Sequence, residues 1–394
     1  MKDFEYYAPT KVFFGKGYEN KAGEIIASYG YRKVMIHYGG GSAKRTGILD
    51  CLEASLAGSG VEYVECGGVQ PNPKLSLARE AIGLCLREKV DLILAVGGGS
   101  VIDSAKCVAA GAADPDTDPW RYLNREKTVE KALPVGVVLT ISASGSEMSS
   151  SCVITNEEGW LKRSFNSDLV RPLFALCNPE LTYSVSKYQT GCGTVDIMMH
   201  TLERYFTTDG EAPLTDRLAE GLLKEVIAAG RIADQNPEDY DARATLMWAS
   251  SLSHNGLTGL GRDYFMSAHQ IEHELSGMFD QVAHGAGLSV LFPAWCRYIY
   301  RYAIDRFCQY AVRVWNLEMD YSHPENTALA GIQATEDYFR SIGMPTRMKE
   351  LGIDPTKEQI EEMAEKATFF GARTFPDYIP LGKKEIVEIF RLAE

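Results

Sequence analysis

The hydrophobic pattern differs between the two halves of the chain. In the first half, short apolar runs such as KVMIHY at 33–38 and DLILAV at 91–96 alternate with amphipathic stretches such as 75–89. Short apolar runs bounded by glycine turns predict buried strands, and apolar residues recurring every three to four positions predict helices. Alternating strands and helices are typical of a parallel sheet covered by helices, so we predict an α/β domain over residues 1–184. The other expected strands are 61–66 and 134–140.

From about residue 185 the pattern becomes helical. Long stretches with a helical period follow one another, and strand candidates are few. The sequence therefore predicts an all-α second domain over residues 185–394. Its expected helices are 187–206, 214–234, 239–256, 264–279 and 284–304.

Composition narrows the class of protein. With 394 residues, 45% hydrophobic and 24% charged, the chain has an ordinary globular composition and room for two domains. A net charge of −13 argues against nucleic acid as a partner, because phosphate contacts need a basic face. No apolar run reaches the ~18 residues of a membrane span, and MKDFEYYAP lacks a signal-peptide core. Nine cysteines without a CxxC pair fit a reducing compartment, so we expect a cytoplasmic protein without a membrane partner.

Two strand–turn–helix units carry the same tetrapeptide, GGGS, at 39–42 and 97–100. Glycines let a backbone approach an anion closely, and the following helix offers free N–H groups at its positive end. In an open parallel sheet, ligands bind at the carboxyl ends of strands, where these turns lie. The alternative is that the glycines only permit a tight turn. The repetition, with a third Ser/Gly turn at 142–146, favours a phosphorylated ligand.

Residues near these turns bear on the identity of the ligand. Neither GxGxxG nor GxxxxGKS/T is present, so the standard dinucleotide and P-loop motifs are absent. Asp103, one turn into the second helix, either compensates the helix dipole or contacts a ribose or nicotinamide group. The first turn lacks an acid for a ribose 2′-hydroxyl and instead has Ser42, Lys44 and Arg45. This favours NADP over NAD, although the two cations can equally be solvated charges.

Four of the seven histidines lie in two short segments, VDIMMH and SAHQIEHELSGMFDQVAHGAG. Residues four apart share one face of a helix, so Asp196 and His200 can point at one spot, and His269 and His273 at another. If these spots coincide, up to three imidazoles, His284 among the candidates, converge with a carboxylate. Such ligands suit a divalent ion such as Fe(II) or Zn(II).

The histidines also have an ordinary structural interpretation. A lone histidine at helical spacing is more often a core residue than a ligand, and HxxxH without the Glu of HExxH is a weak motif. Glu272 and Glu274 flank His273, but one or two positions along a helix they point elsewhere. The histidines without such neighbours, which we interpret as structural, are His37, His254 and His323.

Together these segments resemble the iron-containing alcohol dehydrogenase family, particularly its branch of NADPH-dependent butanol dehydrogenases and broad-range aldehyde reductases. The resemblance covers essentially the whole chain, and the combination is far more specific than any one motif. The segments that carry it are YGGGSAKRTGILD (38–50), GGVQPNP (67–73), LAVGGGSVIDSAK (94–106), SGSE (144–147), RPLFALCNPELTYSV (171–185), DIMMHTLERYF (196–206) and the segment with His269, His273 and His284.

The resemblance implies a dehydroquinate-synthase-like fold, in which a Rossmann-like α/β domain binds the dinucleotide and an all-α domain binds the metal. It implies that His273 faces the nicotinamide and substrate and is not a ligand. The implied metal ligands are Asp196, His200, His269 and His284. The implied nucleotide contacts are Gly40, Ser42, Asn72, Gly98, Gly99, Ser100, Asp103, Thr140, Ser144, Lys162 and Thr182.

Two segments depart from the family pattern. Residues 140–146 read TISASGS where TTAGTGS is usual, which keeps the hydroxyl at Ser144. Residues 177–180 read CNPE where DPE is usual, so a charge is lost there. That position suggests a structural role at the domain junction, so we expect activity to be retained.

The implied activity is hydride transfer between NADP(H) and a small primary alcohol or aldehyde such as butanol or butanal. Fe(II), or Zn(II) or another divalent metal, would act as a Lewis acid, and His273 would relay a proton. The family also implies a homodimer, with the N-terminal strand at 4–15 crossing over.

Three alternatives remain open at this point. A zinc- and NAD-dependent glycerol or polyol dehydrogenase would need an acid at the 2′-phosphate position, which GGGSAKR does not supply. A dehydroquinate-synthase-like lyase would need several Lys and Arg among the metal helices, and these segments are poor in them. The third alternative is a protein that binds metal or nucleotide without turnover.

Overall fold

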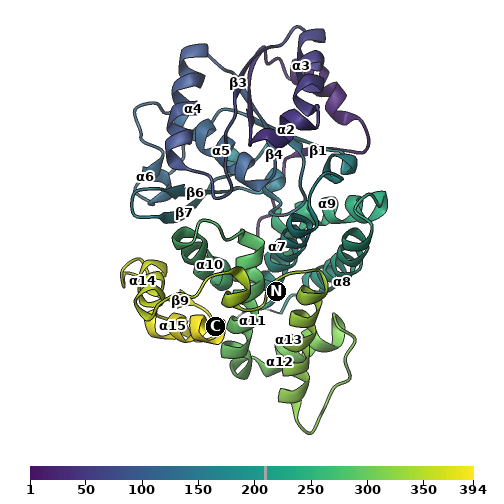
Figure 1. Ribbon diagram of the computed structural model, residues 1–394, viewed down its shortest axis with the longest axis vertical. Coiled ribbons are helices and arrows are strands. Elements are labelled where there is room, and N and C mark those ends of the chain that lie inside the picture. Colours follow the sequence, from purple (N-terminus) through teal and green to yellow (C-terminus); the bar gives the residue numbers. More distant parts are fainter. Residues whose placement is uncertain (208–210) are drawn as a thin grey trace. The chain divides into compact units, whose positions relative to one another are not determined.

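The computed structural model describes residues 1–207 and 211–394, which form two compact units. The α/β unit is Tyr7–Val185, and the helical unit combines Met1–Tyr6 with Ser186–Glu394. Figure 1 follows the chain through both units in sequence order. Among the described residues, no helix combines the length and apolar character that a membrane crossing requires.

The α/β unit is built on a six-stranded parallel sheet. Every residue of the central strand β4 is buried, because helices cover both faces of the sheet. Val96 of β4 pairs with Tyr38 on one side and Val138 on the other, so the carboxyl ends of these strands align at one edge. In spatial order the strands are β1 (Lys11–Phe14), β8 (Phe174–Cys177), β5 (Val135–Leu139), β4 (Leu92–Gly97), β2 (Lys33–Tyr38) and β3 (Glu62–Cys66).

The helices of this unit follow the strands as the sequence predicts, with one difference. The expected helix after the first GGGS is two helices, because Gly47 adopts a left-handed φ of 74° between them. The helices are α1 (Ala22–Ser28), α2 (Gly41–Arg45), α3 (Ile48–Gly58), α4 (Leu75–Glu88), α5 (Gly99–Ala113) and α6 (Trp120–Leu123), with the short 3-10 helices η1 (Tyr18–Lys21), η2 (Ser146–Met148), η3 (Asp168–Val170) and η4 (Pro179–Thr182).

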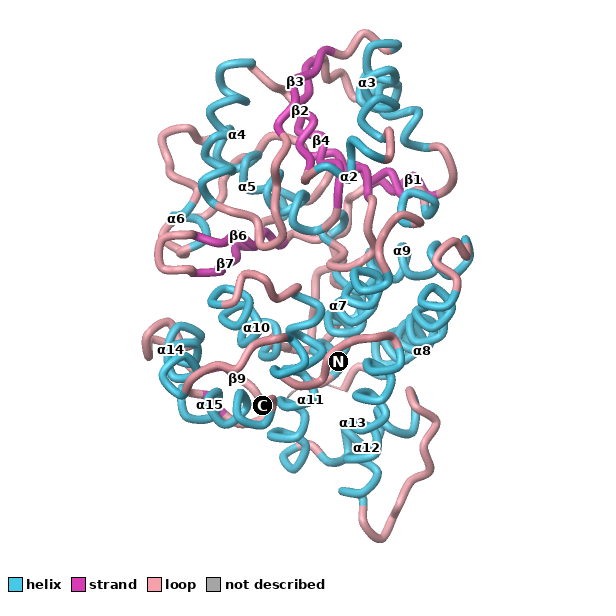
Figure 2. The backbone as a smooth tube through the Cα atoms, viewed as in Figure 1, coloured by secondary structure: helices cyan, strands magenta, loops and turns pink. Residues whose placement is uncertain are grey.

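Pairings distant in sequence complete the α/β unit. Strand β1 pairs with β8, which joins residues about 160 positions apart, and sequence periodicity does not reveal such a pairing. A separate antiparallel hairpin, β6 (Ser151–Asn156) and β7 (Leu161–Asn166), follows β5. Figure 2 shows the hairpin apart from the main sheet and within the same unit.

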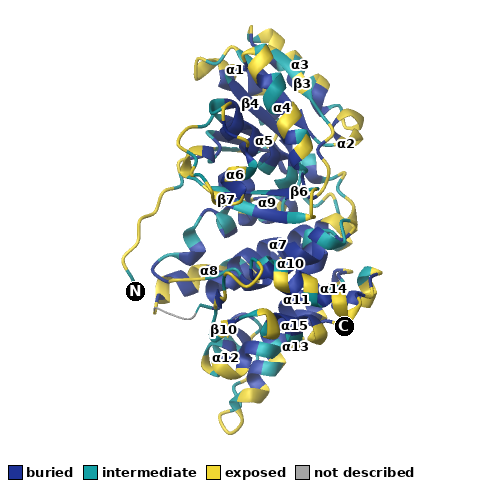
Figure 3. Ribbon diagram, turned by 90° about the vertical axis from the view of Figure 1, so that its left-hand side faces the viewer, coloured by how far each residue is buried: buried dark blue, intermediate teal, exposed yellow. Residues whose placement is uncertain are grey.

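The helical unit contains long helices around one apolar core, as predicted. Helix α11 packs against both α7 and α10, which brings three segments of the chain together. Figure 3 shows α7 and α11 buried along most of their length. The helices are α7 (Lys187–Tyr205), α8 (Pro213–Gln235), α9 (Tyr240–His254), α10 (Ser267–Met278), α11 (His284–Ile299), α12 (Ile304–Arg313), α13 (Pro324–Ser341), α14 (Lys357–Ala367) and α15 (Lys383–Leu392), with η5 (Leu257–Gly259), η6 (Tyr300–Tyr302), η7 (Met348–Leu351) and the small strands β9 (Phe375–Pro376) and β10 (Pro380–Leu381).

Candidate metal centre and coenzyme site

Helix α7 supplies the first half of the candidate metal centre. It begins after Ser186, whose hydroxyl accepts a hydrogen bond from the Gln189 N–H at 3.2 Å and so caps the helix. From Thr190 to its last residue the helix is buried. Asp196 and His200 are four positions apart and therefore lie on the same face.

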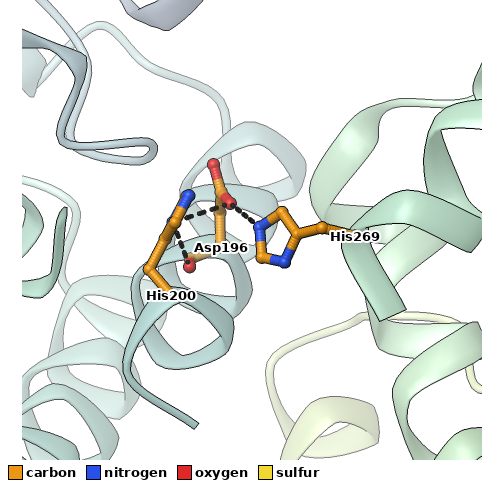
Figure 4. Close-up of side chains that lie close together, drawn as sticks. All are labelled: Asp196, His200 and His269. Carbon is orange, nitrogen blue, oxygen red and sulfur yellow. Dashed lines mark hydrogen bonds and ion pairs between the residues drawn. The ribbon is translucent and has the colours of Figure 1, made fainter. Parts of the chain in front are cut away.

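The four predicted ligands converge on one carboxylate oxygen. Asp196 Oδ1 lies 3.2 Å from His200 Nδ1, 3.7 Å from His269 Nε2 and 3.8 Å from His284 Nε2. His269 lies in the first turn of α10, and His284 is the first residue of α11. Figure 4 shows His200 and His269 on opposite sides of Asp196. Spacing alone left open which histidines meet Asp196, and the tertiary packing of α10 and α11 on α7 resolves it.

The chemistry of these side chains fits a divalent metal ion. Asp196 Oδ1 and His269 Nε2 are buried, and neither has a hydrogen-bond partner among the described residues. Buried polar atoms without a partner are costly, so such a pair facing each other calls for a shared ligand. The Nδ1–H of His200 can donate to the Asp196 carbonyl at 2.9 Å, which leaves its Nε2 as an acceptor. Three imidazoles and one carboxylate suit Fe(II) or Zn(II).

Two buried glutamates contact the outer nitrogens of these rings. His269 Nδ1 hydrogen-bonds to Glu203 Oε2, and His284 Nδ1 to Glu272 Oε2. Glu203 was not among the predicted site residues, and Glu272 was expected to point away from His273. The signal was present, because Glu203 lies seven positions after Asp196 and Glu272 three positions after His269, and each pair shares a helix face.

Burial and neighbouring charges shift the pKa values of the groups at this centre. Burial opposes ionisation of Asp196, but the neighbouring histidines outweigh it and hold the pKa of that carboxyl below its usual range. Burial lowers the pKa of His200 well below its ordinary value. Burial also opposes protonation of His269, yet the Glu203 carboxylate and Asp196 raise its pKa to about 9. Protonation is therefore favoured on His269 and opposed on His200, although both rings lie beside Asp196.

The remaining histidines have different surroundings. His273 is buried, and its ring centre lies 5.6 Å from that of His284. His254, which the sequence analysis interpreted as structural, stacks on His200 with ring centres 4.0 Å apart, so it belongs to the wall of the centre. His37 is a satisfied core histidine, whose ring nitrogens lie 2.9 Å from Cys66 O and 2.8 Å from Ser104 Oγ. His323 is exposed near Glu325.

The second GGGS turn is the start of α5, a long helix whose first residues are Gly99 and Ser100. Gly98 precedes the helix in an extended conformation. A Cβ on Gly98 would lie 2.0 Å from Ile141 Cγ2, and one on Gly99 would lie 2.3 Å from Ser144 Oγ. The glycines therefore permit the loop after β5 to lie against a helix N-terminus, where an anion is favoured.

The structure brings several predicted nucleotide contacts together. Gly99 meets Ser144, and Lys162 Nζ donates to Asn72 Oδ1 at 3.0 Å. The Thr140 N–H donates to the Gly97 carbonyl at 3.1 Å, which joins the ends of β5 and β4. The other predicted contacts lie elsewhere in the unit. Gly40 precedes α2 and Ser42 lies in its first turn, and Thr182 lies in η4, where its buried hydroxyl donates to Pro179 O.

Asp103 and Lys106 of α5 hold the same loop. Asp103 accepts hydrogen bonds from Ser146 Oγ at 2.6 Å and from the Val153 N–H at 3.0 Å, so both carboxylate oxygens have protein partners. Lys106, which the sequence analysis did not single out, is fully buried, and its Nζ lies 2.8–2.9 Å from four oxygens between Ser146 and Ser151. Burial lowers the pKa of Lys106 to about 8, against the opposing charge of Asp103.

The matches to known proteins extend over nearly the whole chain. The family profile "Iron-containing alcohol dehydrogenase" matches residues 9–179, and "Fe-containing alcohol dehydrogenase family, C-terminal" matches residues 190–393. NADH-dependent butanol dehydrogenase A of Clostridium acetobutylicum is 42% identical over 99% of both chains. NADPH-dependent aldehyde reductase YqhD of Escherichia coli is 38% identical over 90% of both chains.

A solved structure supports the same relationship. The NADH-dependent butanol dehydrogenase A of Thermotoga maritima has a TM-score of 0.95 and 37% identity, and the match covers 100% of this chain and 99% of that one. The predicted fold, an α/β domain with a helical C-terminal domain, is thereby confirmed. Family profiles matching both halves, and relatives above 30% identity over nearly the full length, place the protein in the iron-containing alcohol dehydrogenase family, as an enzyme of the alcohol dehydrogenase and aldehyde reductase class.

Proposed function

We propose that the protein reduces a small aldehyde to its primary alcohol, or catalyses the reverse reaction, at a metal centre made by Asp196, His200, His269 and His284. The observation that carries the proposal is the convergence of three imidazole rings on Asp196 Oδ1. Nε2 of His269 and of His284 lies within 3.8 Å of it, and His200 lies there through Nδ1, at 3.2 Å. The named activities of the Clostridium and Escherichia relatives support butanal and butanol as representative substrates.

Each group at the centre has a proposed part in the reaction. A bound divalent ion would supply Lewis-acid polarisation of the substrate oxygen, and a nicotinamide would supply or accept the hydride. Asp196 and the three histidines hold the ion, and Asp196 contributes the negative charge of the set. His273, buried beside His284, moves a proton to or from the substrate oxygen, because imidazole titrates near neutral pH.

Apolar residues at the ends of α10 favour a substrate with an alkyl chain. Phe265 precedes the helix, and Met278 and Phe279 end it. All three are half-buried against the core of the helical unit, so each keeps part of its apolar surface accessible. Such surface favours burial of methylene groups over a polyol, whose hydroxyls would need partners.

The preference for NADP(H) rests on Lys44 and Arg45, and the structure adds an opposing charge. Tyr38 donates a hydrogen bond to Glu65 Oε2 at 2.8 Å, and Lys44 Nζ lies 5.6 Å from the Tyr38 ring centre. Contact with Tyr38 and the nearby Glu65 charge raise the pKa of Lys44. Glu65, near the end of the edge strand β3, thus offsets part of the positive charge that would attract a 2′-phosphate to the end of the neighbouring strand β2.

A comparison of the KM values for NADPH and NADH tests this preference. The parent enzyme is expected to have a lower KM for NADPH than for NADH. Glu65→Gln should widen that difference by freeing Lys44, and Lys44→Ala should narrow it. A parent that prefers NADH, as the names of the Clostridium and Thermotoga relatives would suggest, would refute the preference.

Assembly and location are also proposals. The edge strand β1 and the exposed aromatic side chains of Phe4 and Tyr7 support a homodimer that uses the N-terminal segment. Light scattering on the purified protein should give twice the mass of the 43.5 kDa chain. All nine cysteines have free thiols, which supports the cytoplasm as the location.

Metal exchange tests the activity itself. The protein is stripped with a chelator, refilled anaerobically with Fe(II) or Zn(II), and assayed for oxidation of NADPH or NADH with butanal. Turnover restored by the metal supports the proposal. Absence of butanal turnover with either metal, in protein that binds the metal and the coenzyme, would contradict the proposed substrate.

A further inference from the structure

We propose that Glu203 and Glu272 are positioning residues that fix the imidazoles of His269 and His284 for metal binding. They act as two bridges, from α7 to α10 and from α10 to α11. The inference rests on the proposed metal centre, and its test therefore first asks whether the parent protein binds a metal.

Glu203 joins α7 to the start of α10 with both of its oxygens. Oε2 accepts from His269 Nδ1, and Oε1 lies 2.6 Å from the backbone N–H of Ala268. Helix α10 has no side-chain cap of its own, and the residue before it is Met266. The carboxylate from α7 therefore serves as the N-terminal cap of α10 and matches the positive end of that helix. One buried side chain sets both the position of the helix and the orientation of the His269 ring.

Glu272 joins α10 to the first residue of α11. Its carboxylate is fully buried and accepts from His284 Nδ1. The space for it is provided by Gly287 of α11, where an added Cβ would lie 2.7 Å from Glu272 Oε1 and 2.9 Å from its Cγ. A glycine at that position thus lets α11 approach α10 while the carboxylate reaches His284.

The two bridges also select the tautomer of each ring. With the Nδ1–H held by a carboxylate, the proton that a metal displaces from the ring is the one on Nε2, whose lone pair then binds the metal. In both histidines Nε2 is the atom that faces Asp196, at 3.7 and 3.8 Å. Carboxylates on the outer nitrogen are known to orient metal-bound histidines and to raise their basicity. The same chemistry occurs here twice, from two different helices.

A glutamine at position 203 would reverse the tautomer of His269. If its amide oxygen keeps the Ala268 N–H, its NH2 group faces His269 Nδ1 and donates to it. The ring proton then sits on Nε2, where it blocks a metal. Glu203→Gln is therefore expected to weaken metal binding even if α10 stays in place.

The test measures affinity for the metal alone. Wild-type protein, Glu203→Gln and Glu272→Gln are stripped, and Zn(II) affinity is measured by competition with a chromogenic chelator. We expect each variant to bind Zn(II) roughly 10–100-fold more weakly. The visible absorption of bound Co(II) should also change in both variants, because the geometry of the histidine ligands changes.

Glu220→Gln is the matched control. Glu220 is a buried carboxylate of α8 in the same unit, and it accepts from Tyr205 Oη and Arg313. Its removal should lower the melting temperature and leave the Zn(II) affinity and Co(II) spectrum unchanged. Gly287→Ala gives an independent variant, which displaces the Glu272 side chain without removing its charge and should weaken Zn(II) binding in the same direction.

The outcomes separate the inference from the proposed function. Zn(II) affinities of Glu203→Gln, Glu272→Gln and Gly287→Ala within about twofold of a metal-binding parent would overturn the inference and leave the metal centre standing. A parent that binds neither Zn(II) nor Co(II) would overturn the metal centre and the inference together. Weak binding by the variants, with the control unchanged, would support both.

Discussion

At the scale of single residues, the partner of each ring nitrogen decides what a histidine can do in this protein. His37 lies between a carbonyl and a hydroxyl, so both of its nitrogens are used within the fold. His269 and His284 give one nitrogen to a glutamate and turn the other toward Asp196. His37 therefore has no nitrogen available for a ligand, whereas His269 and His284 each have Nε2 available to bind a metal.

The buried His37 should make stability depend on pH. Burial lowers its pKa from 6.5 to about 4 in the folded chain. Between these values the unfolded chain binds more protons at this site. The contribution of His37 to the free energy of unfolding is therefore fully present above pH 6.5 and is lost as the pH falls towards 4, by about 3 kcal/mol in all. In His37→Gln the free energy of unfolding should change less with pH, by a slope that corresponds to one fewer proton taken up on unfolding. Chemical unfolding of the α/β unit at several pH values measures this slope. Equal slopes in both proteins would contradict the assignment.

His273→Ala should separate proton transfer from metal binding. The side chain lies beside His284 without being one of the four groups that meet at Asp196, so the variant should keep its metal. Its rate of aldehyde reduction should fall by roughly 10²–10⁴-fold, with a changed dependence on pH, if the imidazole is the proton relay. Metal analysis and a pH–rate profile on the same sample decide this. An unchanged rate across pH would exclude the relay.

At the scale of elements, the proposed metal centre depends on how closely α11 approaches α7. Gly285 follows His284, and a Cβ there would lie 2.1 Å from the carbonyl oxygen of Cys192. The neighbour is backbone of a buried helix, which cannot move aside as a flexible side chain can. The absence of a side chain at Gly285 therefore holds His284 at its distance from Asp196.

Gly285→Ala should separate these two helices and loosen the centre. We expect a loss of stability of about 1–3 kcal/mol from overpacking, together with weaker Zn(II) binding. Gly221→Ala is the control, because Gly221 lies within α8 and an added Cβ would meet nothing within 4 Å. The free energy of unfolding of that variant should rise by up to about 1 kcal/mol, because alanine has a higher helix propensity than glycine, and its Zn(II) affinity should equal that of the parent. Thermal melting and chelator competition on both proteins provide the comparison.

Much of the element pattern could be predicted from the sequence. The apolar runs at 33–38 and 91–96 match β2 and β4, because buried parallel strands are apolar throughout. Strand β8, FALC, lies between β5 and β1 and was missed because a run of four residues is too short to show a period. Four of the six residues of hairpin strand β7, LKRSFN, are polar, so the strand carries no clear apolar signal.

The site was predictable in part, for physical reasons. Helical spacing places Asp196 with His200, but a period within one helix contains no information on which residues of another helix will meet them. The choice of His284 came from the family resemblance and stays a prediction, with His284 Nε2 placed 3.8 Å from Asp196 Oδ1. Glu203 and Lys106 were missed because a buried charge on a helix resembles a surface charge until its partner is known.

At the scale of the whole molecule, the two units divide the expected chemistry. The α/β unit contains the glycine turns and the loop held by Lys106, and the helical unit contains the four converging side chains. The family and the class of reaction follow from matches along both units. Family membership leaves the coenzyme preference open, and we propose that the charges of Lys44, Arg45 and Glu65 decide it.

The most direct test of the metal centre is a titration of stripped protein with Fe(II) under anaerobic conditions, followed by the rate of butanal reduction. We predict that the rate rises with added Fe(II) and reaches its plateau at one ion per chain. Asp196→Asn, with a neutral group among the histidines, should need a large excess of metal and stay slow. Butanal reduction that is unchanged by stripping, or that Asp196→Asn performs as the parent does, would contradict the account.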